Sequence, residues 1–119
     1  MKTSRAIAAL GALAQETRLA IFRLLVERGP AGDAAGVIAA KLDIPASSLS
    51  FHLAQLSHAG LIVQRRESRS LIYSVDFAAM NGLMGYLTEN CCGGDASVCA
   101  PACNPLPAAK LPIKTRRIA

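Results

Sequence analysis

Apolar residues recur every three to four positions over most of the first ninety residues, a spacing that predicts helices. We expect a first helix over residues 4–13, capped by Thr3 or Ser4, and a second over residues 17–28. A third helix, rich in alanine and glycine, is expected over residues 33–42. In the second helix the positions predicted to face inward are Leu19, Phe22, Leu25 and Val26.

The next segment combines a helical stripe with an alternating, β-rich pattern. Leu49, Leu53 and Leu56 lie at the spacing of a buried stripe within residues 47–60. The runs "LIVQRR" and "LIYSV" then flank the polar "ESRS", as in a β-hairpin, and a last helix is expected over residues 76–89. Two short helices, a tight turn and a basic hairpin predict a winged helix-turn-helix, mainly α with some β, with about five helices and a hairpin wing.

Composition agrees with one small helical domain. The chain has 119 residues, of which 52% are hydrophobic but only 4% aromatic, so the core is expected to consist of aliphatic side chains. No apolar run approaches the length of a membrane span. We therefore expect a cytoplasmic protein with no membrane partner.

The net charge of +5 is unevenly distributed. From residue 100 onward there are four basic residues and no acidic one, which leaves nine basic and eight acidic residues in 1–99. Overall charge is thus weak evidence for a polyanionic partner. The positions of individual polar and basic residues are the better evidence for or against such a partner.

The positions of the polar and basic residues favour DNA as the partner. A recognition helix needs an apolar side that holds it to the domain and short polar side chains that face the major groove. A polar helix face and arginines on a hairpin are, taken singly, more often solvated surface, but their order along this chain favours double-stranded DNA as the partner. The candidate DNA-binding residues are Ser47, Ser48, Ser50, His52 and Gln55 on the helix and Arg65, Arg66 and Arg69 on the hairpin.

The segments "ALAQETRLAIFRLLV" and "KLDIPASSLSFHLAQLSHAGLIVQRRESRSLIYSV" resemble the ArsR/SmtB family of metal- and metalloid-sensing transcriptional repressors. The resemblance covers roughly residues 5–90. It implies a homodimer that binds a palindromic operator and leaves it when an inducer binds. It also implies a dimer interface formed by the first and last helices, for which the candidates here are Ile7, Leu10, Met80, Leu83, Met84 and Leu87.

All four cysteines of the chain lie within thirteen residues after the last predicted helix. We expect residues 1–90 to form the DNA-binding and dimerisation domain, and residues 91–119 to form a cysteine-bearing inducer-binding segment and a flexible basic tail. The Cys-x-Cys pair that many arsenic sensors of the family carry before the recognition helix is absent, and the last helix lacks the histidine that zinc sensors of the family use. The motif "ENCC" resembles a branch of arsenic-responsive repressors with a C-terminal thiolate site. The candidate ligands are Cys91, Cys92, Cys99 and Cys103.

Several chemical roles for these thiols compete. A disulfide suits neither a reducing compartment nor vicinal cysteines, which pair only with strain. Zinc or cadmium would accept four thiolates, although the usual Cys-x2-Cys spacing is missing. A thiol-redox switch and thiols without a role also remain open. A thiol enzyme would need a positioned base, and no histidine lies near the cluster in sequence, so no enzyme activity is expected.

Trivalent arsenic or antimony is the inducer that fits the thiols best. Such a soft centre needs only three sulfur ligands, and soft thiolates select it over hard ions. Gly93 and Gly94 would let the chain turn back and bring Cys99 to the adjacent pair Cys91 and Cys92. Cys103 is then a substitute ligand or a bystander. The sequence therefore predicts an arsenic(III)-responsive repressor, with a zinc-, cadmium- or redox-responsive repressor of the same family as the alternative.

Overall fold

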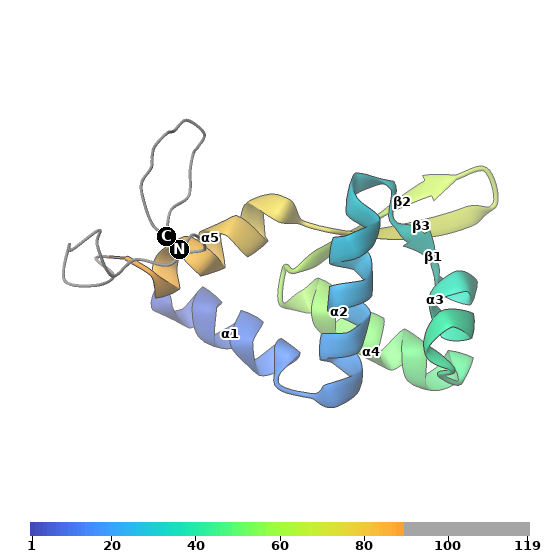
Figure 1. Cartoon of the computed structure of the whole chain (residues 1–119), viewed down its shortest axis with the longest axis horizontal. Helices are drawn as coiled ribbons and strands as arrows, with labels where there is room; N and C mark the ends of the chain where they lie inside the picture. Colours follow the sequence, from blue (N-terminus) through green and yellow to red (C-terminus); the bar gives the residue numbers. More distant parts are fainter. Residues whose placement is uncertain (90–119) are drawn as a thin grey trace, which may run out of the picture. The chain divides into compact units, whose positions relative to one another are not determined.

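The computed structural model describes residues 1–89 of the chain, and the predicted cysteine-bearing segment 91–119 lies outside these residues. The chain divides into two units, Met1–Met80 and Asn81–Ala119. The elements, shown in Figure 1, are α1 (Thr3–Leu13), α2 (Glu16–Arg28), the 3-10 turn η1 (Gly29–Ala31), β1 (Asp33–Ala34), α3 (Ala35–Leu42), α4 (Ala46–His58), β2 (Ile62–Glu67), β3 (Ser70–Val75) and α5 (Phe77–Leu87). These five helices and the wing confirm the predicted winged helix-turn-helix.

The first two helices begin and end within one residue of the predicted positions. The predicted cap of α1 is wrong, because Lys2 occupies the N-cap position and its side chain makes no capping bond. Helix α2 is capped by the Gln15 side chain, whose Oε1 accepts a hydrogen bond from the Arg18 backbone N–H at 2.8 Å. The helix ends at Gly29, whose positive φ of 69° favours glycine.

The core of the first unit is aliphatic, as the composition predicts. Helix α2 contributes buried Ile21, Phe22 and Leu25, whereas Leu19 is 44% exposed although it was predicted to face inward. The inward face is therefore centred on Ile21 and Leu25, four residues apart, and this centring turns Leu19 toward the surface. The other buried hydrophobic residues of the unit are Ala6, Ala9, Ile38, Leu49, Leu53, Leu56, Leu61, Ile62 and Val75.

A three-stranded antiparallel sheet in the order β1-β3-β2 forms the wing and its base (Figure 1). The short strand β1 was not predicted, since residues 33 and 34 were expected to begin the third helix. Asp33 pairs with Tyr73 and Ala34 with Ile72, and this pairing connects the start of α3 to the wing. The hairpin turns at Ser68 and Arg69, with Ser68 at a positive φ of 55°.

The last helix begins after an aspartate cap. The Asp76 Oδ1 atom accepts a hydrogen bond from the Ala79 backbone N–H at 3.1 Å, so α5 starts at Phe77. The helix ends at Leu87, two residues before the predicted end. Within residues 1–89, no helix is long and apolar enough to cross a membrane.

Gly32 connects the 3-10 turn to β1 where the backbone passes close to β3. Its φ is 67° and its ψ −169°, a region that only glycine adopts readily, and a Cβ atom there would overlap the Tyr73 carbonyl oxygen. Gly29 has nearly the same conformation but open space around its Cα atom. Substitution by alanine would therefore cause backbone strain at both glycines, but steric overlap only at Gly32.

We predict that Gly29→Ala lowers the free energy of unfolding by about 1–3 kcal/mol, because it introduces backbone strain alone. Gly32→Ala should cost at least about 1 kcal/mol more, because a methyl group must also displace the Tyr73 carbonyl of β3. Urea unfolding followed by circular dichroism measures both values. Equal losses for the two variants would show that the sheet moves aside without cost.

Candidate nucleic-acid interface

A tight turn places α4 across α3. Asp43 adopts the left-handed conformation with φ 54°, and the Ile44 N–H donates to the Ala39 carbonyl at 3.0 Å, which ends α3. Pro45 then takes the N-cap position of α4, and its carbonyl accepts a hydrogen bond from the Leu49 N–H at 2.9 Å. Three residues therefore suffice to reverse the chain between the two helices (Figure 1).

Helix α4 is held by its leucines and exposes its polar face. Leu49, Leu53 and Leu56 are buried, as predicted from their spacing, and α4 packs against α1, α2, α3 and β2. Ser47, Ser48, Ser50 and Gln55 are all exposed. Four of the predicted contact residues thus lie on the solvent side of one well-anchored helix.

His52 is only half-buried and has a partner in the domain. Its Nδ1 atom lies 3.3 Å from Nη1 of Arg18 in α2, and the Arg18 Nε–H donates to the Ala12 carbonyl at 2.6 Å. Because a guanidinium can only donate, Nδ1 has to accept, and the ring proton lies on Nε2. His52 therefore presents a hydrogen-bond donor, oriented by Arg18, at the edge of the polar face.

An open groove of about 320 Å³ lies beside the same helix, between α1 and the second half of α4. Arg18, Gln55 and His58 provide its polar groups, and the rest of its lining is alanine and glycine.

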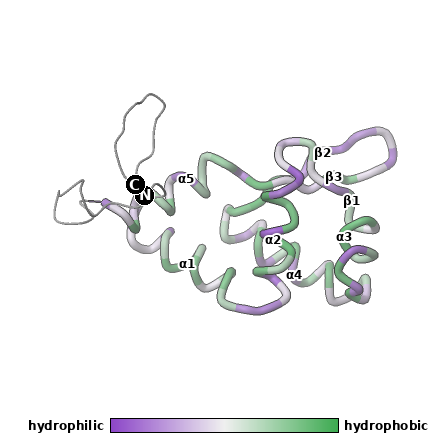
Figure 2. The backbone as a smooth tube through the Cα atoms, viewed as in Figure 1, coloured by the Kyte–Doolittle hydropathy of each residue, from purple (hydrophilic) through white to green (hydrophobic). Residues whose placement is uncertain are grey.

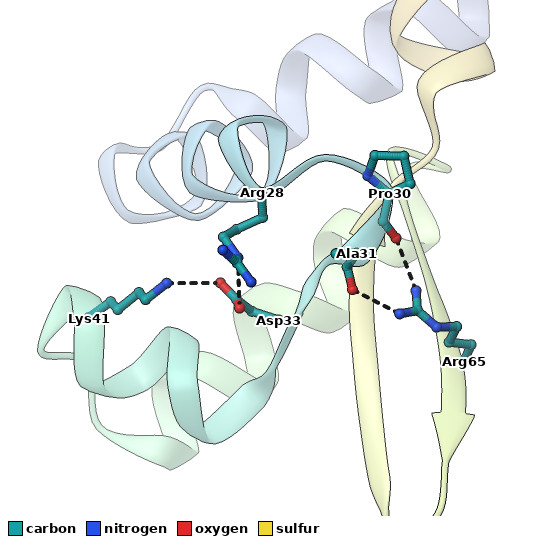
Figure 3. A network of polar contacts seen from close by, with 6 residues as sticks. All are labelled: Arg28, Pro30, Ala31, Asp33, Lys41 and Arg65. Carbon is teal, nitrogen blue, oxygen red and sulfur yellow. Dashed lines mark hydrogen bonds and ion pairs between the residues drawn. The ribbon is translucent and has the colours of Figure 1, made fainter.

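The wing places its arginines on different sides. Arg65 donates hydrogen bonds to the carbonyls of Pro30 at 3.1 Å and Ala31 at 2.8 Å (Figure 3). It also forms an ion pair with Glu67 at 2.7 Å. Arg66 and Arg69 are exposed, and the side chain of neither has a hydrogen bond or ion pair within residues 1–89. The end of the hairpin is hydrophilic (Figure 2), and the side chains of Arg66 and Arg69 are available there to phosphates. We interpret Arg65 as a positioning residue that fixes the wing to η1, rather than as the DNA contact expected from the sequence.

Asp33 is the centre of a second polar cluster, which the sequence did not reveal. Its carboxylate is 6% exposed and accepts from Arg28 Nε at 3.0 Å and Lys41 Nζ at 3.4 Å (Figure 3). The three residues come from the end of α2, from β1 and from the last turn of α3. The cluster therefore joins the helix-turn-helix to the strand that pairs with the wing.

The predicted dimer-interface residues differ in their burial within one chain. Ile7, Leu10, Met84 and Leu87 are exposed, Met80 is half-buried and Leu83 is 6% exposed. Large exposed apolar side chains on a small protein commonly mark an interaction surface.

The predicted metal ligands Cys91, Cys92, Cys99 and Cys103 lie outside the described residues. Within residues 1–89, no group of three or more His, Cys, Asp or Glu side chains could hold a metal ion.

Comparison with known proteins identifies the fold's relatives. Residues 13–65 match a family described as "Helix-turn-helix domain". The HTH-type transcriptional regulator YgaV of Escherichia coli K12 is 32% identical over 88 residues, which cover 74% of this chain and 87% of YgaV. The chain belongs to the ArsR family of winged helix-turn-helix transcriptional regulators. It is thus a DNA-binding regulator and not an enzyme.

Two solved structures agree with this assignment. The homodimeric winged helix-turn-helix domain of Mb0332 from Mycobacterium bovis, described as a possible ArsR-family regulator, matches with a TM-score of 0.58 at 26% identity, over 73% of this chain and 81% of that domain. A possible transcriptional regulator for arsenical resistance matches with a TM-score of 0.58 at 26% identity, over 66% of this chain and 79% of that one.

The two kinds of wing arginine lead to opposite expectations. Arg65→Gln should lower the free energy of unfolding by about 0.5–1 kcal/mol through lost hydrogen bonds, and weaken DNA binding without changing its salt dependence. Arg66→Gln should leave stability unchanged but reduce the slope of log K against log salt by about 0.9, one phosphate contact. Urea unfolding and fluorescence anisotropy at several salt concentrations measure these effects. If Arg65→Gln reduces the salt slope as much as Arg66→Gln, Arg65 is a phosphate contact.

Proposed function

We propose that the protein is an arsenic(III)-responsive repressor that binds operator DNA as a homodimer and dissociates when trivalent arsenic or antimony binds its C-terminal thiolates. The observation that carries the DNA-binding part is α4, whose leucine stripe is buried while its serines and Gln55 are exposed. Such a helix offers short hydrogen-bonding side chains to base edges in a major groove. The unpaired Arg66 and Arg69 then supply the phosphate contacts that set register and orientation.

The homodimer is supported by the exposed apolar residues of α1 and α5. Ile7 and Leu10 on α1, and Met84 and Leu87 on α5, are large apolar side chains that remain exposed in one chain, as an interface between two copies would require. The related domain of Mb0332 is homodimeric. Two copies of α4 would then recognise the two halves of a palindromic site about 34–36 Å apart.

Arsenic is supported by the chemistry of the four cysteines. Arsenous acid carries three hydroxyl groups, and three thiols can replace them, forming three As–S bonds and releasing three waters. Cys91, Cys92, Cys99 and Cys103 offer one thiol more than this requires, whereas residues 1–89 contain no competing metal-binding cluster. The similarity to a possible regulator for arsenical resistance agrees with this choice.

Release of DNA follows from the geometry that a dimer has to maintain. Both recognition helices have to enter the groove together, so a small change in their separation or angle costs much of the affinity. Coupling energies of about 1–3 kcal/mol per effector site are usual, and a dimer has two sites. The cysteines that would bind arsenic follow α5 closely in sequence, and α5 contains Met84 and Leu87 of the proposed interface. Arsenic binding can therefore change the separation or angle of the two recognition helices.

We predict that arsenite lowers the affinity of the thiol-reduced protein for its operator at least tenfold, since two coupled sites act on each dimer. Cys91→Ser and Cys92→Ser should bind the operator as the wild type does but fail to release it, because each breaks the adjacent thiolate pair, whereas Cys103 could substitute only for Cys99. Anisotropy titration of labelled operator with arsenite, antimonite, zinc and cadmium gives the measurement.

The matched control is Cys103→Ser, which should retain most of the response if Cys99 is the third ligand. Release by zinc or cadmium but not by arsenite would favour the alternative inducer. A full response in Cys91→Ser or Cys92→Ser would place the site elsewhere.

We predict that Leu10→Glu shifts the protein from dimer to monomer, because it buries a charge in the proposed interface. Leu19→Glu is the control, since Leu10 and Leu19 are 41% and 44% exposed and only Leu10 lies in the proposed interface. Sedimentation velocity measures the mass of each species. A Leu10→Glu variant that remains dimeric, or a Leu19→Glu variant that dissociates equally, would contradict the interface.

A further inference from the structure

Phe51 is an exception to the polar character of the exposed face of α4. Its side chain is 58% exposed, and it is the one large hydrophobic residue of this helix that is exposed. Phe51 is not part of the leucine stripe. Neither the packing of α4 nor the proposed DNA contacts of its serines require an aromatic ring at this position. An exposed phenyl ring can gain free energy by contact with an apolar group of a partner, because the contact removes apolar surface from water.

The position of Phe51 identifies the partner. It follows Ser47 and precedes Gln55 by four residues each, so all three lie along one line of the helix, on the side away from Leu49, Leu53 and Leu56. The surface on which Phe51 lies is therefore the surface proposed to enter the major groove.

The ring also has an oriented neighbour. The rings of Phe51 and His52 meet edge to face, with centroids 5.6 Å apart and an interplanar angle of 67°. His52 is in turn held by Arg18, whose Nη1 lies 3.3 Å from Nδ1. Arg18 and His52 thus restrict the ring of Phe51 before DNA binds, which lowers the entropy cost of binding.

In a major groove, the 5-methyl group of thymine is the apolar group among base edges that otherwise offer hydrogen-bond donors and acceptors. We propose that Phe51 is a specificity-determining residue that contacts the 5-methyl group of one thymine in each half-site. This inference rests on the proposed function, because it requires α4 to enter the groove of a specific DNA site.

The experiment replaces thymine by deoxyuridine, which removes the methyl group and changes no base-pairing group. An operator is first selected from random duplexes with the wild-type protein, and each thymine is then replaced in both half-sites. At one position per half-site the wild type should lose about fourfold in affinity for each methyl group removed, or about tenfold or more for both. Phe51→Ala should bind the thymine and uracil duplexes equally.

Two further variants serve as controls. Phe51→Leu keeps an apolar side chain and should retain part of the preference for thymine. Leu19→Ala removes an exposed apolar side chain from α2 and should retain all of it. The uracil scan of the wild type and Phe51→Leu decide the question even if Phe51→Ala folds poorly.

The outcomes separate this inference from the proposed function. If the wild type binds uracil as well as thymine at every position, or if Phe51→Ala discriminates as the wild type does, Phe51 does not contact the methyl group. Those results leave DNA binding and arsenite release intact. If the protein selects no DNA sequence at all, the proposed function fails as well.

Discussion

The burial of Leu49, Leu53 and Leu56 is the constraint on which the rest of the DNA-reading unit depends. These side chains fix α4 against neighbouring helices and against β2, and this fixes which residues of α4 point outward. A helix rotated by one residue would bury a polar position and lose a leucine from the core, at a cost of a few kcal/mol. The hydrophobic effect therefore sets the orientation of the polar face that we propose to contact DNA.

Polar contacts then fix the positions of the helix ends and of the wing, which apolar packing alone does not fix. Asp33 joins the ends of α2 and α3, and Arg65 joins the wing to the carbonyls of η1 (Figure 3). Hydrogen bonds to a buried carboxylate are directional, and loss of one partner would leave the charge poorly compensated. The recognition helix and the wing are thus fixed relative to each other through η1 and β1, a segment of six residues.

Regular patterns in the sequence predicted the fold well, because side chains that are buried at regular intervals appear as regularly spaced apolar residues in the sequence. The leucine stripe and the hairpin both follow from local rules and match the structure. Strand β1 was missed, since two residues are too few for a pattern and their conformation is decided by pairing with β3. The hydrogen bonds of Arg65 to Pro30 and Ala31 were not predicted for a similar reason, as these partners lie more than thirty residues earlier in the chain. Phe51 was also not predicted as a contact residue, although the sequence alone shows an aromatic residue outside the apolar stripe of this helix.

The distribution of chemistry along the chain constrains how an inducer could act. Neither the aliphatic side chains that hold α4 nor the Asp33 cluster that joins α2 to α3 includes a set that could bind a metal ion within residues 1–89. An inducer bound by thiolates that follow α5 in sequence would therefore act without replacing any contact that orients α4 in its own unit. Because packed aliphatic cores resist deformation, the recognition helix would keep its internal geometry in the induced state. The change that releases DNA would then lie between protomers, in the spacing or angle of two intact readers, and not in the unfolding of either one.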